Sequence, residues 1–209
     1  MAEDDTLRLA ELLCSRLCHD LAGPIGGAAA GVELLGEEGG GGEIGALLGA
    51  SVTTAARHLN YYRRAFGKTT APANPAALRR LAEEFLAGWP SPSAPGEFEW
   101  WEEGEGEWPP DQAKLVLNLL LIARDALPRG GRLDVRLRRG RQWSIEVAAT
   151  GRVMAGEALE ALNAAGLDGL TPRGAQAYYA GLLAHRLGCR IEVTATDDGL
   201  RLMVAHGEH

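Results

Sequence analysis

The stretch "LCSRLCHDLAGPIGGAAAGVELL", residues 13–35, decides how the N-terminal part of the chain folds. From Thr6 to Leu35 the apolar residues recur at spacings of three, four and seven, which predicts an amphipathic helix. We expect Asp5 to cap this helix and the glycine-rich segment 36–42 to end it. A second helical pattern covers residues 44–62 and ends near Gly67. The two helices together predict an antiparallel hairpin.

Such a hairpin exposes an apolar stripe on each helix, and two helices alone cannot cover both stripes. Pairing with a second copy would bury them in an intermolecular four-helix bundle, so we expect a homodimer. The segment "KTTAPANP", residues 68–75, has the prolines and small polar residues of a linker. The expected domains are therefore a helical hairpin over residues 1–68 and a second domain over residues 76–209.

The second domain mixes strand and helix patterns. Alternating apolar residues and turn signals predict a strand at "EFEWWEE", a hairpin at "GRLDVRLRRG" with "QWSIEVAAT", and another at "CRIEVTATDDGLRLMVAH". Helices are expected at "DQAKLVLNLLLIARDAL", with Asp111 as N-cap, and at "TPRGAQAYYAGLLAHRLG". One face of the sheet is apolar and needs helices to cover it. The predicted fold class is thus α+β: a helical hairpin followed by an α/β two-layer sandwich.

The composition predicts a soluble globular protein that stays in the cytoplasm. The chain has 209 residues, of which 46% are hydrophobic and 23% charged. The net charge of -7 argues against nucleic acid, and the one basic cluster, at Arg63, Arg64 and Lys68, is interpreted as a solvated helix end. No apolar run reaches the roughly 18 residues of a membrane span. Three cysteines suit a reducing compartment.

The first helix carries the candidate site. At about 100° per residue, the apolar positions fall on one face and His19 lies nearly opposite, pointing at solvent. On the same side we expect a surface for partner docking, formed by Leu12, Ser15, Arg16, Gly23, Pro24 and Gly26. Glycine costs about 1 kcal/mol in a helix, and Pro24 should kink it just past His19. These features predict a reactive histidine that another protein approaches closely. Asp20 beside it would tune the imidazole or accept its proton.

Two plainer interpretations of this segment were considered. His19 could be a surface histidine without a role. Alternatively, Cys14, Cys18 and His19 could bind zinc, but His19 points about 100° away from Cys18 and no second ligand cluster follows. We therefore expect no metal site, and we interpret the two cysteines as small buried hydrophobes.

Two segments resemble those of two-component histidine kinases. "HDLAGPI" resembles the phosphoacceptor segment, in which a helical histidine is followed by an acid and, five positions on, by proline. "NLLLIARDAL" resembles the ATP-binding segment, and the matching residues are Asn118, Ala123, Asp125 and Ala126. The hairpin is then similar to the dimerisation and phosphotransfer domain of these kinases, and the second domain to their ATPase domain.

The departures from the kinase pattern fall on the nucleotide site. Ile122 stands where the magnesium-ligating asparagine belongs, and Ala149 and Val153 replace the adenine-binding acid and the second glycine after it. The expected glycine-rich lid instead contains Gln176, Tyr178 and Tyr179. We therefore expect no bound nucleotide and a structural role for Asn118. With "YYRRAFG" and "AYYAGLLAHRLGCRIEV", nearly the whole chain resembles the ChpT-type histidine phosphotransferases of alphaproteobacteria.

This resemblance implies a dimeric phosphorelay shuttle. His19 would take a phosphoryl group from the receiver aspartate of a hybrid histidine kinase and pass it to the receiver domains of response regulators, without ATP. The chain itself would bind no cofactor, since magnesium would come with the partner receiver domain. Two other functions stay open at this point: a dimeric scaffold that sequesters a response regulator, and an ATP-dependent autokinase. Ile122, Ala149 and Val153 oppose the second.

Overall fold

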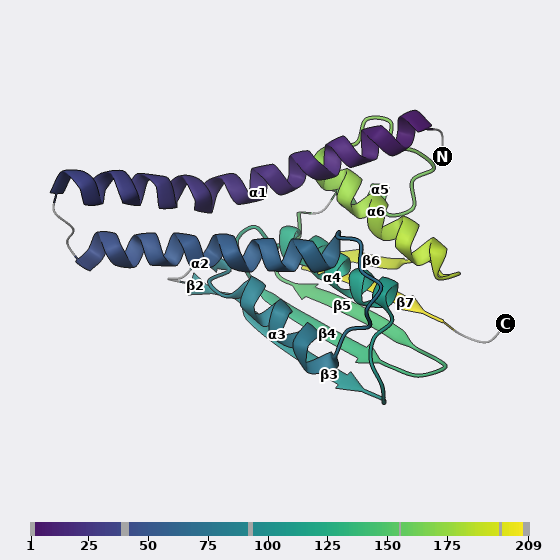
Figure 1. Cartoon of the computed structure of the whole chain (residues 1–209). Coiled ribbons are helices and arrows are strands. Elements are labelled where there is room, and N and C mark those ends of the chain that lie inside the picture. Colours follow the sequence, from purple (N-terminus) through teal and green to yellow (C-terminus); the bar gives the residue numbers. More distant parts are fainter. Residues whose placement is uncertain (1–2, 39–41, 92–93, 155, 197, 207–209) are drawn as a thin grey trace.

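Two long antiparallel helices form the N-terminal part of the fold (Figure 1). The computed structural model describes residues 3–38, 42–91, 94–154, 156–196 and 198–206. Helix α1 spans Glu3–Glu38 and helix α2 spans Gly42–Ala65, and the two pack along their length. They pack closely at Gly31, where an added Cβ would lie 3.2 Å from the Cβ of Leu48. The predicted hairpin is confirmed; residues 39–41 of its predicted glycine connection lie outside the described residues.

Pro24 lies inside α1 and does not end it. Figure 1 shows α1 as one continuous helix that curves along its length. The helix starts before Thr6 and runs past Leu35, so it is longer at both ends than the apolar spacing predicted. Asp5 is therefore not its cap, because the helix already begins at Glu3 and Asp5 lies within its first turn.

A five-stranded mixed sheet forms the centre of the second domain. Its strand order is β3 (Glu97–Glu103), β4 (Arg132–Arg138), β5 (Ser144–Thr150), β7 (Gly199–Ala205) and β6 (Glu192–Thr196). Strands β3 and β4 are parallel and the other neighbouring pairs are antiparallel. Two short strands, β1 (Pro90–Ser91) and β2 (Ala94–Pro95), pair separately. The predicted strand at 97–103 and both predicted hairpins are confirmed.

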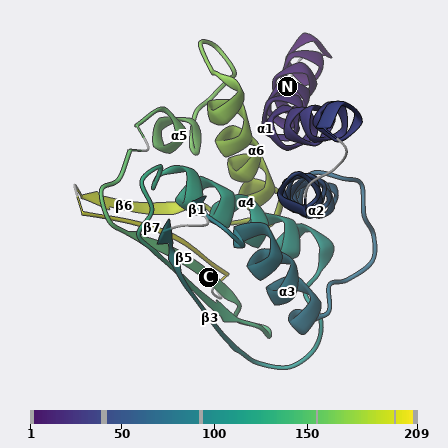
Figure 2. The same ribbon diagram turned by 90° about the vertical axis from the view of Figure 1, so that its left-hand side faces the viewer.

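The helices lie on one face of this sheet, as Figure 2 shows. They are α3 (Pro75–Leu86), α4 (Pro110–Asp125), α5 (Gly156–Ala161) and α6 (Pro172–Arg186). Apolar side chains on alternate positions of β4, β5 and β7 are buried beneath them. Every residue of α4 from Ala113 to Ala123 is buried, because the helix lies between the sheet, α2 and α6. This core confirms the predicted α+β class.

Two expectations about helices need correction. Asp111 was expected to cap α4, but the cap position is Pro109, Pro110 begins the helix and Asp111 lies in the first turn. The linker prediction also overlooked α3, which starts at Pro75, inside the expected linker. The side chain of Asn74 accepts a hydrogen bond from the Ala77 N–H and so caps this helix.

The end of α2 packs against the second domain and holds the hairpin in place. The Tyr61 ring stacks on Phe85 of α3 with 3.7 Å between ring centroids. Its hydroxyl donates to the Leu117 carbonyl at 2.6 Å. Helix α1 packs against α6 on the other side. The phosphoacceptor candidate on α1 therefore lies next to the second domain.

Candidate functional site

The imidazole of His19 is the most exposed part of the site. Its side chain is 80% exposed, on the surface of α1, as the helical spacing predicted. Nδ1 lies 3.1 Å from Oδ1 of the neighbouring Asp20. A neutral imidazole that carries its proton on Nδ1 donates it to this oxygen and leaves Nε2 with a free lone pair. The contact with Asp20 is compatible with this tautomer, in which Nε2 is the free nitrogen.

Asp20 points back toward the protein interior. Its Oδ2 accepts hydrogen bonds from Arg16 Nε and from the Tyr62 hydroxyl, both at 2.7 Å. Burial raises the pKa of this carboxyl, but Arg16, Tyr62 and His19 together outweigh that effect and lower the pKa below its ordinary value. Asp20 is therefore ionised at neutral pH and can accept a hydrogen bond from its histidine neighbour.

Arg16 is buried, which corrects the expectation that it lies on the docking surface. Its side chain is 3% exposed and passes beneath α1 to contact Asp125 at the end of α4. Burial lowers the pKa of the Arg16 guanidinium, but Asp125 and Asp20 raise it more, so it stays charged. An arginine with two carboxylate partners is stably buried, whereas helical spacing alone places it at the surface.

A hollow of about 410 Å³ opens beside His19. Ser15, Arg16 and His19 of α1 form one wall, and the start of α6 forms the other with Thr171, Pro172 and Arg173. The Glu157 carboxylate fixes this second wall, because it accepts hydrogen bonds from the backbone N–H and the hydroxyl of Thr171, at 2.6 and 2.7 Å. The second domain thus contributes directly to the surroundings of the histidine.

The other predicted docking residues are divided between the surface and the interior. Ser15, Gly23 and Gly26 are exposed, and a Cβ added at Gly23 or Gly26 would meet nothing within 4 Å. Packing within this chain therefore does not explain these two glycines. Pro24 is half-buried. Leu12 is also half-buried and packs against the core, so it is not a freely exposed docking residue.

The residues that replace the kinase nucleotide site are packed together. Asn118 is fully buried; its amide donates to the Ala65 and Lys114 carbonyls and its Oδ1 accepts from Gln176 Nε2 at 3.0 Å. Ile122 and Ala149 are buried as well. The expected structural role of Asn118 is confirmed, since its side chain joins α4 to α2 and α6.

The cysteines differ from expectation. Cys14 and Cys18 are exposed, not buried, and only Cys189 lies in the core. Within the part of the chain that the structure describes, no three His, Cys, Asp or Glu side chains are placed to hold a metal ion. No helix in that part is long and apolar enough to cross a membrane.

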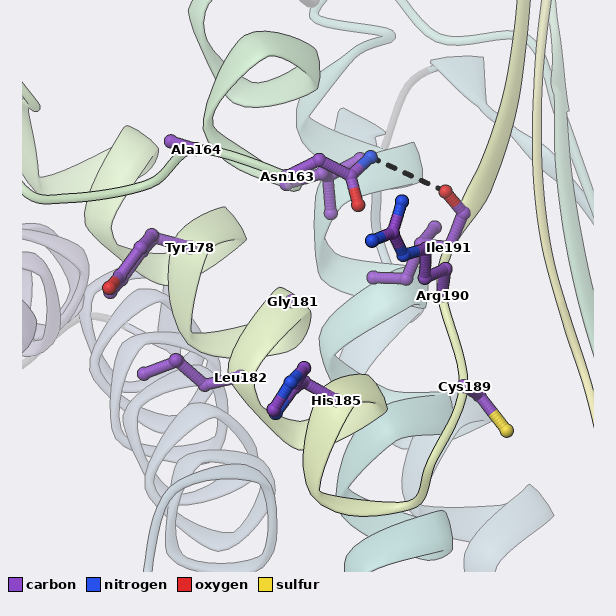
Figure 3. A pocket seen from close by; sticks show the side chains of 10 residues that line it. Asn163, Ala164, Tyr178, Gly181, Leu182, His185, Cys189, Arg190 and Ile191 are labelled. Carbon is purple, nitrogen blue, oxygen red and sulfur yellow. Dashed lines mark hydrogen bonds between the residues drawn. The ribbon is translucent and has the colours of Figure 1, made fainter.

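A second hollow, of about 230 Å³, lies along the later turns of α6 (Figure 3). Tyr178, Leu182 and His185 line it from α6, and the Asn163 amide donates to the Ile191 carbonyl at its rim at 3.4 Å. It shares no lining residue with the hollow beside His19, which meets α6 only at its start. The two hollows are therefore separate: the first lies between α1 and the start of α6, and the second lies within the second domain.

Sequence reasoning did not assign Tyr62 and Asp125 to the site. Tyr62 is 42 positions from Asp20 and Asp125 is 109 positions from Arg16. Asp125 did match the kinase ATP-binding segment, but the match gave it no role at His19. The packing of α1 on α2 brings Tyr62 to the surroundings of His19, and the packing of the hairpin on the second domain brings Asp125 there.

Comparisons with known proteins show what the whole chain is similar to. The family model described as the histidine phosphotransferase C-terminal domain matches residues 78–199. The protein phosphotransferase ChpT of Brucella abortus (strain 2308) is 33% identical over 201 residues, which is 93% of each chain. A solved 1.7 Å structure of a bacterial phosphotransferase superimposes with a TM-score of 0.81 and 32% identity, covering 98% of this chain and 97% of that one.

Proposed function

The chain belongs to the ChpT-type histidine phosphotransferases, and we propose that His19 is the residue that carries the phosphoryl group in its phosphorelay. The observation that supports this most strongly is the imidazole itself: exposed, held through Nδ1 by Asp20, and placed beside a hollow. We propose that the donor is the receiver aspartyl phosphate of a hybrid histidine kinase. The acceptors are receiver domains of response regulators.

The chemistry is a nucleophilic displacement at phosphorus. The Nε2 lone pair of neutral His19 attacks in line, an N–P bond forms and the P–O bond of the aspartyl phosphate breaks. The receiver carboxylate leaves with the bonding electron pair. The Nδ1 proton stays between the ring and Asp20 Oδ1, where the carboxylate offsets the positive charge that the phosphorylated imidazole acquires. Attack by a second receiver aspartate reverses these steps.

The partner receiver docks over the start of α6 and the exposed face of α1. Arg173 offers a positive charge at the hollow beside His19, where a phosphoryl group must enter. Gly23 and Gly26 leave α1 bare at the next turns, so a partner backbone can come close. Magnesium would come with the partner's acidic pocket, where it would neutralise charge on the transferring group. This chain supplies the nucleophile, the carboxylate that holds its Nδ1 proton and the docking surface.

The active form is a homodimer that pairs through the helical hairpin. Large apolar side chains of α1 and α2 are exposed in the single chain: Ile25, Val32, Leu34, Leu47, Val52 and Leu59. Burial of a Leu or Val side chain stabilises by about 1.5–3 kcal/mol, so covering these residues favours association. A four-helix bundle through residues 6–66 covers both stripes.

Transfer proceeds without nucleotide. Asn118 is engaged by Gln176, and Ile122 offers no lone pair at the position of a kinase magnesium ligand. The packed interior between α4 and α6 supports the start of α6 instead. The second domain then serves as docking surface and support.

The test is to incubate the full chain with a receiver domain that carries radiolabelled aspartyl phosphate and, separately, with radiolabelled ATP. We expect acid-labile label on the chain from the receiver and none from ATP. Asp20→Asn should slow the transfer by about 10²-fold, in the range of a positioned proton acceptor. Label from ATP would favour the autokinase, and binding of the receiver without any label would favour the scaffold.

A further inference from the structure

Arg16 connects the phosphoacceptor helix to the second domain. Its Nε donates to Asp20 Oδ2 at 2.7 Å, and its Nη2 donates to Asp125 Oδ2 at the last residue of α4. The side chains of Asp20 and Asp125 are 15% and 18% exposed, so both ion pairs are largely shielded from solvent. One buried guanidinium thus joins two carboxylates that are far apart in the sequence.

We propose that Asp125 of the second domain is a positioning residue for His19. Asp125 fixes Arg16, Arg16 fixes Asp20 Oδ2, and Asp20 Oδ1 then holds Nδ1 of the imidazole. The inference rests on the proposed role of His19 and adds to it that the phosphotransfer site is completed by the degenerate ATPase-like domain. In this chain the aspartate that matched the nucleotide-binding pattern acts on the phosphoacceptor instead.

The directions of the contacts support a positioning role. Arg16 and Tyr62 both donate to the same oxygen of Asp20, Oδ2. This orients the carboxylate so that its other oxygen faces His19. Three elements, α1, α2 and α4, therefore determine the orientation of one exposed ring. A free arginine side chain has about 2 kcal/mol of rotamer entropy, so Arg16 needs its second partner, Asp125, to hold a single position.

The position of Asp20 determines which tautomer of the His19 ring is favoured. With Asp20 held in place, the proton stays on Nδ1 and Nε2 is the nucleophile. If Asp125 no longer fixes Arg16, the carboxylate moves and the tautomer with the proton on Nε2 becomes populated. That tautomer has no lone pair on the nitrogen that faces the partner. The tautomer ratio of His19 is therefore a readout that a purely stabilising ion pair would not change.

The experiment compares the full-length wild-type chain with Asp125→Asn. We expect the transfer rate at saturating phosphorylated receiver to fall by about tenfold. This is a part of the roughly 10²–10⁴-fold rate gain that a positioned acid–base group contributes. The receiver concentration for half-maximal rate should stay unchanged, because Asp125 does not line the hollow beside His19. Nitrogen-15 NMR, with the His19 signal assigned from a His19→Gln spectrum, should show a mixture of tautomers in the variant and the Nδ1-protonated form in the wild type.

Asp134→Asn is the matched control. Asp134 is 17% exposed and paired with Arg132 at 2.9 Å. The Asp134→Asn variant therefore loses a similarly shielded ion pair, but on the sheet and away from His19. It should leave the transfer rate and the tautomer of His19 as in the wild type. Asp125→Glu, which keeps the carboxylate, should recover most of the rate.

A double-mutant cycle makes the test decisive. If Asp125 acts only through Asp20, Asp125→Asn should cause no further slowing in an Asp20→Asn background. An independent tenfold loss there, or a wild-type rate and tautomer in Asp125→Asn alone, overturns the inference. If Asp125→Asn does not fold, Arg16→Lys takes its place, because it keeps the charge but lacks the second donor nitrogen that joins Asp20 to Asp125; an unchanged tautomer in that variant overturns the inference as well. Failure of the wild-type chain to accept label would refute the proposed function itself, a different outcome.

Discussion

Asn118→Ala should destabilise the protein strongly although Asn118 faces no ligand. The asparagine is fully buried and its side chain makes three hydrogen bonds, to the Ala65 carbonyl at 3.0 Å, the Lys114 carbonyl at 2.9 Å and Gln176 at 3.0 Å. These contacts join α4 to the end of α2 and to α6. The substitution therefore weakens the junction between the hairpin and the second domain.

The magnitude follows from what each partner loses. The Ala65 carbonyl lies in a buried residue at the end of α2, and leaving it without this donor costs about 1–3 kcal/mol. Gln176 retains the Asn118 backbone carbonyl at 3.1 Å, so its loss is a single net hydrogen bond, about 0.5–1.5 kcal/mol. Lys114 keeps its helical partner. The sum is about 1.5–4.5 kcal/mol, or roughly 3–18 °C in melting temperature for a chain of this length.

Urea unfolding followed by circular dichroism measures this loss. Asn163→Ala is the control, since Asn163 is exposed and its amide makes one long hydrogen bond, 3.4 Å, to the Ile191 carbonyl. That variant should lose less than about 1 kcal/mol. A loss below about 0.5 kcal/mol in Asn118→Ala would refute the structural role assigned to this asparagine.

Three further predictions concern assembly, nucleotide and pH. Light scattering of the wild-type chain should give twice the 22.2 kDa chain mass. Val32→Glu on α1 should lower the measured mass toward that of one chain, whereas Trp101→Glu on the sheet should leave it unchanged. A monomeric wild type would contradict the four-helix bundle. Calorimetry with ATP and magnesium should show no heat beyond dilution, whereas micromolar affinity would contradict the packed site around Asn118. Burial, followed by the Arg124 charge, lowers the pKa of His58 below its ordinary 6.5. The unfolded chain therefore binds a proton that the folded chain resists, so the free energy of unfolding should fall as pH drops from about 7 through 6.5 and level off below the folded pKa. His58→Gln should flatten this slope, and an unchanged slope would contradict the assignment.

The sequence predicted the elements with strong periodicity and the exposed phosphoacceptor candidate. Strands β4, β5 and β7 alternate strictly, and the helical spacing placed His19 opposite the apolar face, where its side chain is 80% exposed. It missed α3, although Asn74 followed by Pro75 is a typical helix start, because the prolines before it suggested a linker. The apolar residues of α3, Leu78, Ala82 and Phe85, have helical spacing and are buried.

The interior of the site could not be predicted from local pattern. Helical spacing treats Arg16 as a surface residue, since its burial depends on Asp125, 109 positions away. In the same way, Cys14 and Cys18 were interpreted as buried from residue type, yet the packing of α1 on α2 and α6 leaves them exposed. Long-range packing decides such positions, and a one-dimensional pattern does not contain it.

The most direct test of the proposed function is label uptake from a phosphorylated receiver by His19→Ala. The exposed imidazole contributes little packing, so this variant should keep the fold and the dimer and take up no label. His185→Gln, an exposed histidine on α6, should take up label at the wild-type rate. Loss of uptake in His19→Ala alone is the predicted result. Label on His19→Ala, together with loss of label in His185→Gln, would show that the phosphoacceptor is elsewhere.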